Sequence, residues 1–487
     1  MNPRSLILFL LLSPLLNAQG RTVVGIRGPQ FTINGNPTYS AQEGFPSADP
    51  NLEGTLLNVR VVQAIFDDEN YPNGGSRMHP YTSNTLGPVF WDYPDGPWDP
   101  ERNLREFLVA LPEWRREGVL AVTVNLQGGG PADGNYGEKE EQPQLNSGFD
   151  SHGNLKPAYA ARLQRVIEET DRLGMVVIVG FFYSGSEERI ELSPGDSYVR
   201  EAIKQACTFL KNLSHRNVLI EINNETSSGY KHPLLRPQGI VDALLLAQAT
   251  VQHQIPVSMS WSGGITPCSL DADAAIRAAD YILLHTNGQK PETVHETIQA
   301  MRRCAGYDRP VMINEDGVST FNLESAVQEH VGWGYYDNGL GNYFDGFQDP
   351  PINWGISSNV KWVFFEQVAR LTGSPAPAQP KYADSSLPGI TVFGLKPGQA
   401  LSGRNWIEAI VTDHEPRWPI KRVEFFIDDK AYSYRLNAPY YLGGQEWWDA
   451  LDVSAGPHTL RVVAYDMRGP RFTETCSILE IPFSIER

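Results

Sequence analysis

The feature that most constrains the fold is a rhythm of eight short apolar runs between residues 57 and 371, each followed by a polar tip and a helix-period segment. The runs lie at residues 58–66, 119–126, 175–182, 217–222, 256–261, 281–285, 310–314 and 331–336. Short apolar runs that alternate with amphipathic segments indicate buried parallel strands joined by helices. Eight such units in about 315 residues fit the size of an α/β (β/α)8 TIM barrel.

An open, doubly wound parallel sheet is the alternative arrangement for alternating strands and helices. It would be favoured by a glycine-rich phosphate turn that follows an early strand and opens a helix. Gly128, Gly129 and Gly130 follow the second run, but they lead into a long loop. We therefore expect the barrel.

Composition shifts on both sides of this region. Asn34-Gly35 signals an N-terminal hairpin, so we assign residues 19–371 to the hairpin and barrel together. Residues 372–388 are rich in Pro, Ala and Ser and are predicted to form a linker. Residues 389–487 contain short alternating segments, separated by turn residues, without a helical period. This pattern predicts an all-β immunoglobulin-like sandwich.

The first residues resemble an export signal. Arg4 precedes an apolar stretch at 6–16, which ends near Ala18, and this pattern predicts a signal peptide at residues 1–18. A buried N-terminal helix is the alternative. No other segment is apolar for long enough to span a membrane. We expect a secreted or periplasmic protein.

The four cysteines show no CxxC spacing, which excludes a zinc framework of the usual kind. Cys207 and Cys304 lie in helical patterns and are interpreted as small buried hydrophobes. One disulfide is compatible with export, but the sequence does not select its pair. The formal net charge of −17, without a basic stripe, argues against nucleic acid as a partner. The oligomeric state stays open.

Two of the apolar runs end in an asparagine followed by a glutamate. The fourth ends at Asn224-Glu225 and the seventh at Asn314-Glu315. Barrel enzymes place their chemistry at the carboxyl ends of the strands. A pair of carboxyl groups is what the hydrolysis of a glycosidic bond requires, without a metal or another cofactor. For each glutamate the alternative is a solvated carboxylate at a strand end.

Asn-Glu at the end of the fourth strand and Glu at the end of the seventh resemble the pattern of the clan A glycoside hydrolases, with some likeness to family-five cellulases and mannanases. The resemblance implies that Glu225 is the acid/base, Glu315 the nucleophile, and Asn224 a ligand of the sugar 2-hydroxyl. It also implies that His285 contacts the sugar and that Trp333 forms the floor of the central subsite.

The chain departs from that pattern at several positions. Thr226 replaces the proline that usually follows the acid/base, and Asn287 stands where the family has a tyrosine that orients the nucleophile. Asn125, rather than an arginine, ends the second run. Arg60 in the first run is expected to reach Glu315, or else to form an ion pair with a buried acid such as Glu221. Asn125, Arg60 and Trp261 complete the candidate substrate-binding residues.

Aromatic side chains are frequent in the predicted loops and suit the C–H faces of pyranose rings. Those of the first loop are Tyr71, Tyr81, Phe90, Trp91, Tyr93 and Trp98. The C-terminal segment resembles bacterial immunoglobulin-like modules that are attached to secreted glycosidases. The resemblance implies a spacer or stabiliser, with Trp447 and Trp448 as its candidate adhesive residues.

Together these patterns predict a secreted retaining glycoside hydrolase that cleaves β-glycosidic bonds of a polysaccharide or oligosaccharide. A non-catalytic glycan-binding barrel would keep the cleft without the reaction. A structural cell-surface protein, in which the sandwich is the working part, is the second alternative.

Overall fold

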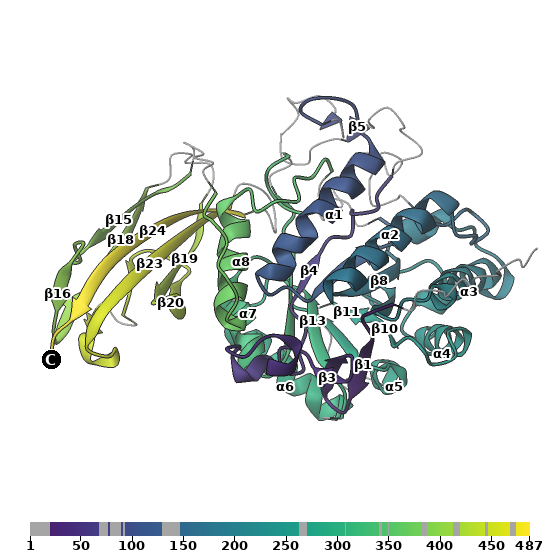
Figure 1. Cartoon of the computed structure of the whole chain (residues 1–487), viewed down its shortest axis with the longest axis horizontal. Helices are drawn as coiled ribbons and strands as arrows, with labels where there is room; N and C mark the ends of the chain where they lie inside the picture. The colour runs from purple at the N-terminus through teal and green to yellow at the C-terminus, as the bar shows by residue number, and fades with distance from the viewer. Residues whose placement is uncertain are drawn as a thin grey trace, which may run out of the picture.

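The computed structural model describes residues 20–67, 76–77, 89–90, 93–128, 147–262, 270–306, 308–339, 343–348, 350–380, 387–412, 419–443, 447–467 and 474–487. The expected signal peptide and the aromatic residues Tyr71, Tyr81 and Trp91 lie outside these ranges. Within them, the chain folds into a barrel and a sandwich that lie side by side, with α7 and α8 between them (Figure 1).

A closed parallel barrel forms the first part of the molecule. Its strands are β4 (Asn58–Arg60), β7 (Ala121–Asn125), β8 (Val176–Phe182), β9 (Val218–Asn223), β10 (Val257–Ser258), β11 (Ser260–Trp261), β12 (Ile282–His285), β13 (Val311–Glu315) and β14 (Gly332–Tyr335). The sheet order is β10-β9-β8-β7-β4-β14-β13-β12-β11. The first and last strands in this order, β10 and β11, are separated only by Met259 and are therefore two pieces of one strand. The sheet is therefore an eight-stranded barrel, as the sequence predicts.

The helices cover the outside of the barrel. They are α1 (Pro100–Arg116), α2 (Pro157–Leu173), α3 (Ser197–Asn212), α4 (Ile240–Thr250), α5 (Leu270–Ala278), α6 (Pro291–Ala305), α7 (Thr320–Gln328) and α8 (Asn359–Thr372). Proline at the first position of α1, α2 and α6 suits a helix start, where its missing N–H costs nothing. Gly174 ends α2 in the left-handed conformation that glycine adopts most easily.

A small antiparallel sheet precedes the barrel. It consists of β1 (Val24–Arg27), β2 (Gln30–Ile33) and β3 (Asn36–Pro37). Asn34 and Gly35 both have positive φ in the turn between β2 and β3, as a tight two-residue turn requires. The Phe31 ring is fully buried against Tyr281, directly before β12, so this sheet packs beneath the amino ends of the barrel strands. In the loop after β4, β5 (Ser76–Arg77) pairs with β6 (Val89–Phe90).

The C-terminal part is an all-β sandwich. Its five-stranded sheet contains β16 (Gln399–Leu401), β19 (Ile420–Ile427), β20 (Lys430–Arg435), β23 (Gly456–Met467) and β24 (Glu474–Ile485). The opposite side contains β15 (Gly389–Phe393), β17 (Arg404–Trp406), β18 (Glu408–Thr412), β21 (Tyr440–Tyr441) and β22 (Trp447–Asp449). An apolar core that includes Phe425, Trp448 and Leu460 fills the space between them.

The five-stranded sheet also packs against the barrel. Alternate residues of its strands, among them Phe426, Val463 and Tyr465, belong to the same buried cluster as the barrel core. Arg461 of β23 forms a 2.7 Å ion pair with Glu366 of α8. The sandwich is thus docked on the barrel, which suits the stabiliser rather than the spacer that the resemblance implies.

One expectation about the cysteines is wrong. Cys304 takes part in a disulfide and is not a free buried thiol. Cys207 is free and fully buried, as expected, and Cys476 is also free. Among the described residues, no helix has both the length and the apolar character needed to cross a membrane.

Candidate active site

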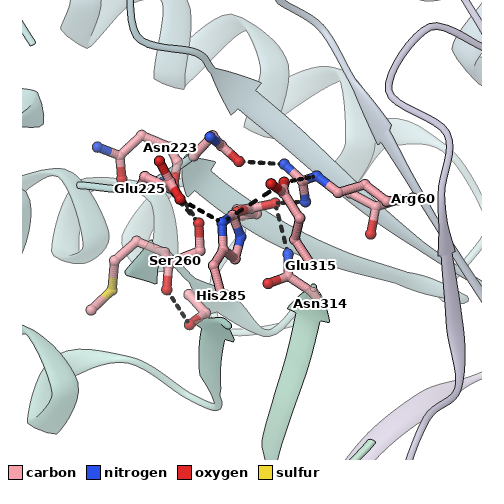
Figure 2. A network of polar contacts seen from close by, with 12 residues as sticks. Arg60, Asn223, Glu225, Ser260, His285, Asn314 and Glu315 are labelled. Carbon is pink, nitrogen blue, oxygen red and sulfur yellow. Dashed lines mark hydrogen bonds and ion pairs between the residues drawn. The ribbon is translucent and has the colours of Figure 1, made fainter. Parts of the chain in front are cut away.

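Polar side chains converge inside the carboxyl end of the barrel. Arg60 of β4 lies opposite Thr123 of β7. Gly180 of β8 lies between Asn125 of β7 and Glu221 of β9. Because side chains alternate between the faces of a strand, these positions share the inner face. A Cβ atom at position 180 would lie 2.2 Å from Oδ1 of Asn125, so glycine there leaves space for the asparagine. Figure 2 shows the network that these strands support.

Arg60 lies at the centre of this network and is fully buried. Its Nε lies 2.6 Å from Oε2 of Glu315, and its Nη1 lies 3.4 Å from Oε2 of Glu221. It also donates a hydrogen bond to Oδ1 of Asn224. Burial by itself lowers the pKa of the guanidinium, but the charges of Glu221 and Glu315 raise it above its ordinary value. Both pairings considered for this arginine are therefore present.

Glu225 follows β9 in an unusual backbone conformation. Its φ of 52° lies in the left-handed region, which a non-glycine residue occupies at some cost. Its backbone N–H donates to Oγ of Ser260 at 2.9 Å. The carboxylate accepts a 2.9 Å hydrogen bond from the Ser228 hydroxyl, and its other oxygen lies 3.1 Å from Nδ1 of His285. With 26% of its side chain exposed, Glu225 is accessible from the barrel mouth.

Glu315 ends β13 and is more enclosed, with 10% of its side chain exposed. Besides its ion pair with Arg60, its Oε1 accepts a 3.1 Å hydrogen bond from Nδ2 of Asn287. Asn287 therefore donates to the candidate nucleophile from the position where the resembled family has a tyrosine. The Arg60 guanidinium and the Asn287 amide together hold the Glu315 carboxylate in one orientation.

His285 lies between the two glutamates (Figure 2). Its Nδ1 is 3.8 Å from Oε2 of Glu315, in addition to its contact with Glu225. Burial alone lowers the pKa of His285, but the charge of Glu315 and the hydrogen bond with Glu225 raise it above 6.5. For Glu225, burial raises the pKa, whereas the hydrogen bond and charge of His285 outweigh burial and lower it. In the free protein, the imidazolium thus favours ionised Glu225.

Asn224 and Asn125 are buried at the same end of the barrel. Asn224 is held by Arg60 through its side-chain oxygen, and its backbone oxygen accepts from the Tyr230 hydroxyl. Asn314 donates to Glu221 at 3.3 Å. The asparagines that precede each glutamate therefore belong to one network with the buried ion pairs.

Trp333 does not form the floor of this site. Its ring is fully buried and packs against Phe364 of α8, with centroids 5.9 Å apart, on the outer side of the barrel wall. Its Nε1 donates to Oδ2 of Asp316 at 2.8 Å. The reason is strand alternation, which turns the ring of Trp333 toward the helices.

Trp261 is also part of the apolar core and is 3% exposed. Trp261 belongs to a row of residues that are in register across four neighbouring strands. The other members of this row are Leu284, Ile313 and Trp333. Residues in register on parallel strands share a face, so this row points outward. Trp261 therefore belongs with the packing between the sheet and the helices, and the prediction that it binds substrate is wrong for the same reason.

The sequence-based candidates omit several residues that lie in or beside the site. Tyr183 and Tyr336 follow β8 and β14, and burial raises the pKa of each phenol. The charge of Glu315 raises both pKa values further. Asn287 and Ser260 were missed as well. All four residues lie where an apolar run ends in polar or aromatic residues. The sequence shows these strand ends, but it does not show which of their residues face the inside of the barrel.

Glu225, His285 and Glu315 each offer an atom that could bind a metal ion, and these atoms all lie within 4.8 Å of one another. Carboxylate and imidazole donors suit an ion such as Zn²⁺. Arg60 already supplies positive charge 2.6 Å from Glu315, however, and would repel a cation there. The arrangement suits proton transfer and nucleophilic attack better than metal binding.

Neither a protein-family profile nor a curated protein sequence matches this chain. Its fold is similar to that of an endo-β-1,4-mannanase from Thermotoga petrophila, with a TM-score of 0.39 and 11% identity over 89% of this chain and 98% of the mannanase. A β-glucosidase from Thermotoga maritima has a TM-score of 0.42 and 11% identity, over 66% of this chain and 99% of that enzyme. For β-mannanase from the blue mussel Mytilus edulis, the TM-score is 0.42 and the identity 12%, over 72% and 97% of the two chains.

Proposed function

We propose that this protein is a secreted retaining glycoside hydrolase that cleaves β-glycosidic bonds in a polysaccharide or oligosaccharide. The observation that carries the proposal is the spacing of two carboxylates at the mouth of the barrel. One oxygen of Glu225 and one of Glu315 lie within 4.8 Å of each other. Retaining glycosidases hold their carboxyl groups about 5–5.5 Å apart, whereas inverting enzymes need roughly 6.5–9.5 Å to admit a water molecule.

The surroundings of the two glutamates support different roles. Glu315 is held in one orientation by its ion pair with Arg60 and its hydrogen bond from Asn287, as a nucleophile needs. Glu225 is the more exposed of the two and lies on a loop after β9, where a leaving group and then water can reach it. We therefore assign Glu315 as the nucleophile and Glu225 as the acid/base.

The reaction proceeds in two displacements. An oxygen of Glu315 attacks the anomeric carbon while the bond to the leaving oxygen breaks, and Glu225 gives that oxygen a proton. Glu225, now ionised, takes a proton from water, and the water oxygen attacks the anomeric carbon and frees Glu315. Asn224 contacts Arg60 within the network, Asn125 lies at the same end of the barrel, and both are proposed to bind hydroxyl groups of the sugar.

The first displacement requires a protonated Glu225, although His285 favours its ionised form in the free protein. Burial is the largest influence on the pKa of Glu225, and it acts upward. A bound sugar covers the exposed part of this side chain and adds to that effect. When Glu315 becomes an ester, it loses the charge that supports imidazolium at His285, so a neutral His285 can accompany the second step.

The test uses Glu225→Gln and Glu315→Gln, with Glu168→Gln as a control on the exposed side of α2. On a panel of β-linked polysaccharides, each active-site variant should lose at least about a hundredfold in kcat/KM, while the control should match wild type. A substrate with a dinitrophenyl leaving group should restore much of the first displacement in Glu225→Gln only, because such a leaving group needs no proton.

A 2-fluoro glycoside should trap the intermediate, and peptide mass analysis should locate the label at Glu315. Proton NMR of the first product should show the same anomeric configuration as the substrate. Wild-type protein without activity on the whole panel would favour the glycan-binding barrel. A label at another residue would overturn the assignment of roles.

A further inference from the structure

The outer face of the sandwich carries exposed aromatic side chains. On β17 and β18, Ile407 and Ala409 are buried in the sandwich core, so Trp406 and Glu408 point to the opposite, outer side. On β22, Trp448 is buried and Trp447 is 52% exposed. The same alternation exposes one side of β15 and β21.

These outward residues form a continuous group across the strands. Register pairs Trp406 with Trp447, and Glu408 with both Phe393 and Tyr441. We call Phe393, Trp406, Glu408, Tyr441 and Trp447 the aromatic platform. Phe393 and Tyr441 flank Glu408 on neighbouring strands and so lie about 10 Å apart, or two strand spacings.

Three rings of the platform contact one another through Trp406. The Trp406 ring lies 4.9 Å from that of Tyr441 and 5.6 Å from that of Trp447, nearly perpendicular to both. Trp406 Nε1 donates to the Glu408 carboxylate at 3.3 Å. A Cβ atom at Gly394 would lie 1.7 Å from the carbonyl oxygen of Trp406, so glycine there allows the end of β15 to approach closely. Trp406 thus contacts Tyr441, Glu408 and Trp447, while Phe393 is 61% exposed.

In the part of the chain that the structure describes, the barrel lies on the other side of the sandwich core from this surface. The five-stranded sheet contacts the barrel on one face and the sandwich core on the other. The platform lies beyond that core, on β15, β17, β18, β21 and β22. In Figure 1, β15 and β18 lie on the side of the sandwich that is away from the barrel. A ligand here cannot be the same sugar unit that Glu225 and Glu315 contact.

The chemistry of the platform favours a sugar over other occupants. Aromatic faces pack against the C–H surfaces of a pyranose, and a carboxylate accepts hydrogen bonds from its hydroxyl groups. An apolar protein surface would add no donor to the one that Trp406 Nε1 supplies, and burying the charged Glu408 carboxylate against it would be costly. Glu408 and the net charge of −17 disfavour an anionic polymer.

We propose that the aromatic platform binds a neutral polysaccharide chain, as a second glycan site separate from the barrel. Such a site would hold the protein on an insoluble polymer while the barrel acts elsewhere along it. The inference goes beyond the proposed hydrolysis and does not require it, because the platform binds whether or not the barrel cleaves.

The test is a pull-down of the full chain, carrying Glu225→Gln and Glu315→Gln to prevent digestion, on insoluble mannan and on microcrystalline cellulose. Trp447→Ala in this background should weaken binding to at least one polymer by roughly fivefold to tenfold, the effect of one aromatic contact. Trp447→Tyr should keep most of the binding. Val109→Ala, at an exposed site on α1, should behave as the parent. Circular dichroism and the melting temperature should not change in Trp447→Ala.

Three results would overturn the proposal: no binding of the parent to either polymer, equal binding by Trp447→Ala, or a dimer in sedimentation that Trp447→Ala dissolves without any effect on polymer binding. The last result would make the platform an interface between two copies. Trp447→Ala in the otherwise native chain should hydrolyse a short soluble glycoside as wild type does. If no substrate is cleaved but Trp447 still controls binding, the proposed hydrolysis fails and the platform stands.

Discussion

His285 is placed so that it influences the protonation of both candidate catalytic groups. It is fully enclosed, and its ring nitrogen lies closer to Glu225 than to Glu315. An imidazolium in this position stabilises two carboxylates that would otherwise repel each other. In the proposed mechanism the acid/base and the nucleophile need different protonation states in the first step, so we expect His285 to influence the pH range of activity.

Replacing His285 with glutamine removes the positive charge and should raise the pKa of Glu225, because the interactions with His285 are what lower it. The alkaline limb of the kcat/KM profile, where the acid loses its proton, should move to higher pH. An unchanged alkaline limb, measured on a substrate with a poor leaving group, would show that His285 does not control the acid.

The His285→Gln variant should also change how the free energy of unfolding depends on pH. The pKa of His285 is raised on folding, so its contribution is complete below its unfolded pKa near 6.5 and is lost as pH rises through the folded value. Wild type should therefore lose stability over that range relative to His285→Gln. Urea denaturation at a series of pH values measures the difference, and parallel curves for the two proteins would contradict it.

Asn287 is the second residue whose effect on activity can be tested apart from its effect on folding. Its hydrogen bond to Glu315 has a charged acceptor, so Asn287→Ala should lower kcat/KM by about tenfold to a hundredfold. Asn287→Asp places a negative charge beside the nucleophile and should also move the acidic limb of the pH profile upward. A purely structural role would change melting temperature without moving that limb, and wild-type kinetics for Asn287→Ala would remove the residue from the site.

At the scale of single elements, an irregularity next to β13 decides which side chains reach the interior. The register between β12 and β13 shifts after Leu284, so that His285 pairs with Glu315. Strict alternation would place Asn314 and Glu315 on opposite faces. With the shift, Asn314 contacts Glu221 while Glu315 contacts Arg60. This small distortion lets two neighbouring residues serve one network.

The contact between α8 and β23 is another element-level feature with a testable energy. Arg461 is 6% and Glu366 8% exposed in their ion pair, and the guanidinium also lies over the ring of Trp362. Arg461→Ala leaves the Glu366 carboxylate buried without its partner and should lower the free energy of unfolding by about 3–5 kcal/mol.

The double variant Arg461→Met with Glu366→Met should recover most of that loss, because no charge is then left buried. Chemical denaturation followed by tryptophan fluorescence measures all three proteins. If Arg461→Ala costs no more than an exposed ion pair, below about 1 kcal/mol, the pair does not stabilise the docking.

For the whole molecule, the barrel and the sandwich share a buried cluster and should unfold together. Phe321 of α7 packs against Phe426, and Ser319 donates to Glu424 at 2.9 Å. Ser319 follows Glu315 by four residues, so the sandwich supports the loop that leaves the candidate nucleophile. This arrangement connects the second part of the chain to the site without adding a residue to it.

Removal of residues 381–487 should therefore do more than shorten the protein. The deletion exposes Phe321 and Trp362, so the remaining barrel should aggregate at lower temperature than the full chain, which should melt in a single transition. Its kcat on a short soluble glycoside should fall because the loop after β13 loses support. Two separate transitions in the full chain, with full activity of the barrel alone, would show that the two parts are independent.

The sequence alone determined the eight strands, the helices between them, the all-β segment and the two glutamates at strand ends. These features depend on local patterns, such as apolar run length, helical period and the polar residue at which each run stops. It also identified Arg60 as a possible partner of either Glu315 or Glu221, but not that it would contact both.

Only the tertiary structure decided which candidates face the site. Barrel closure brings Arg60, Glu221, Glu225, His285 and Glu315 together from distant parts of the chain, a result of the register of the closed sheet. Trp333 and Trp261 turned outward, and Asn287 turned inward, because the face of a residue depends on strand register and on local irregularities. A change of one position reverses the face, and apolar content alone does not reveal it.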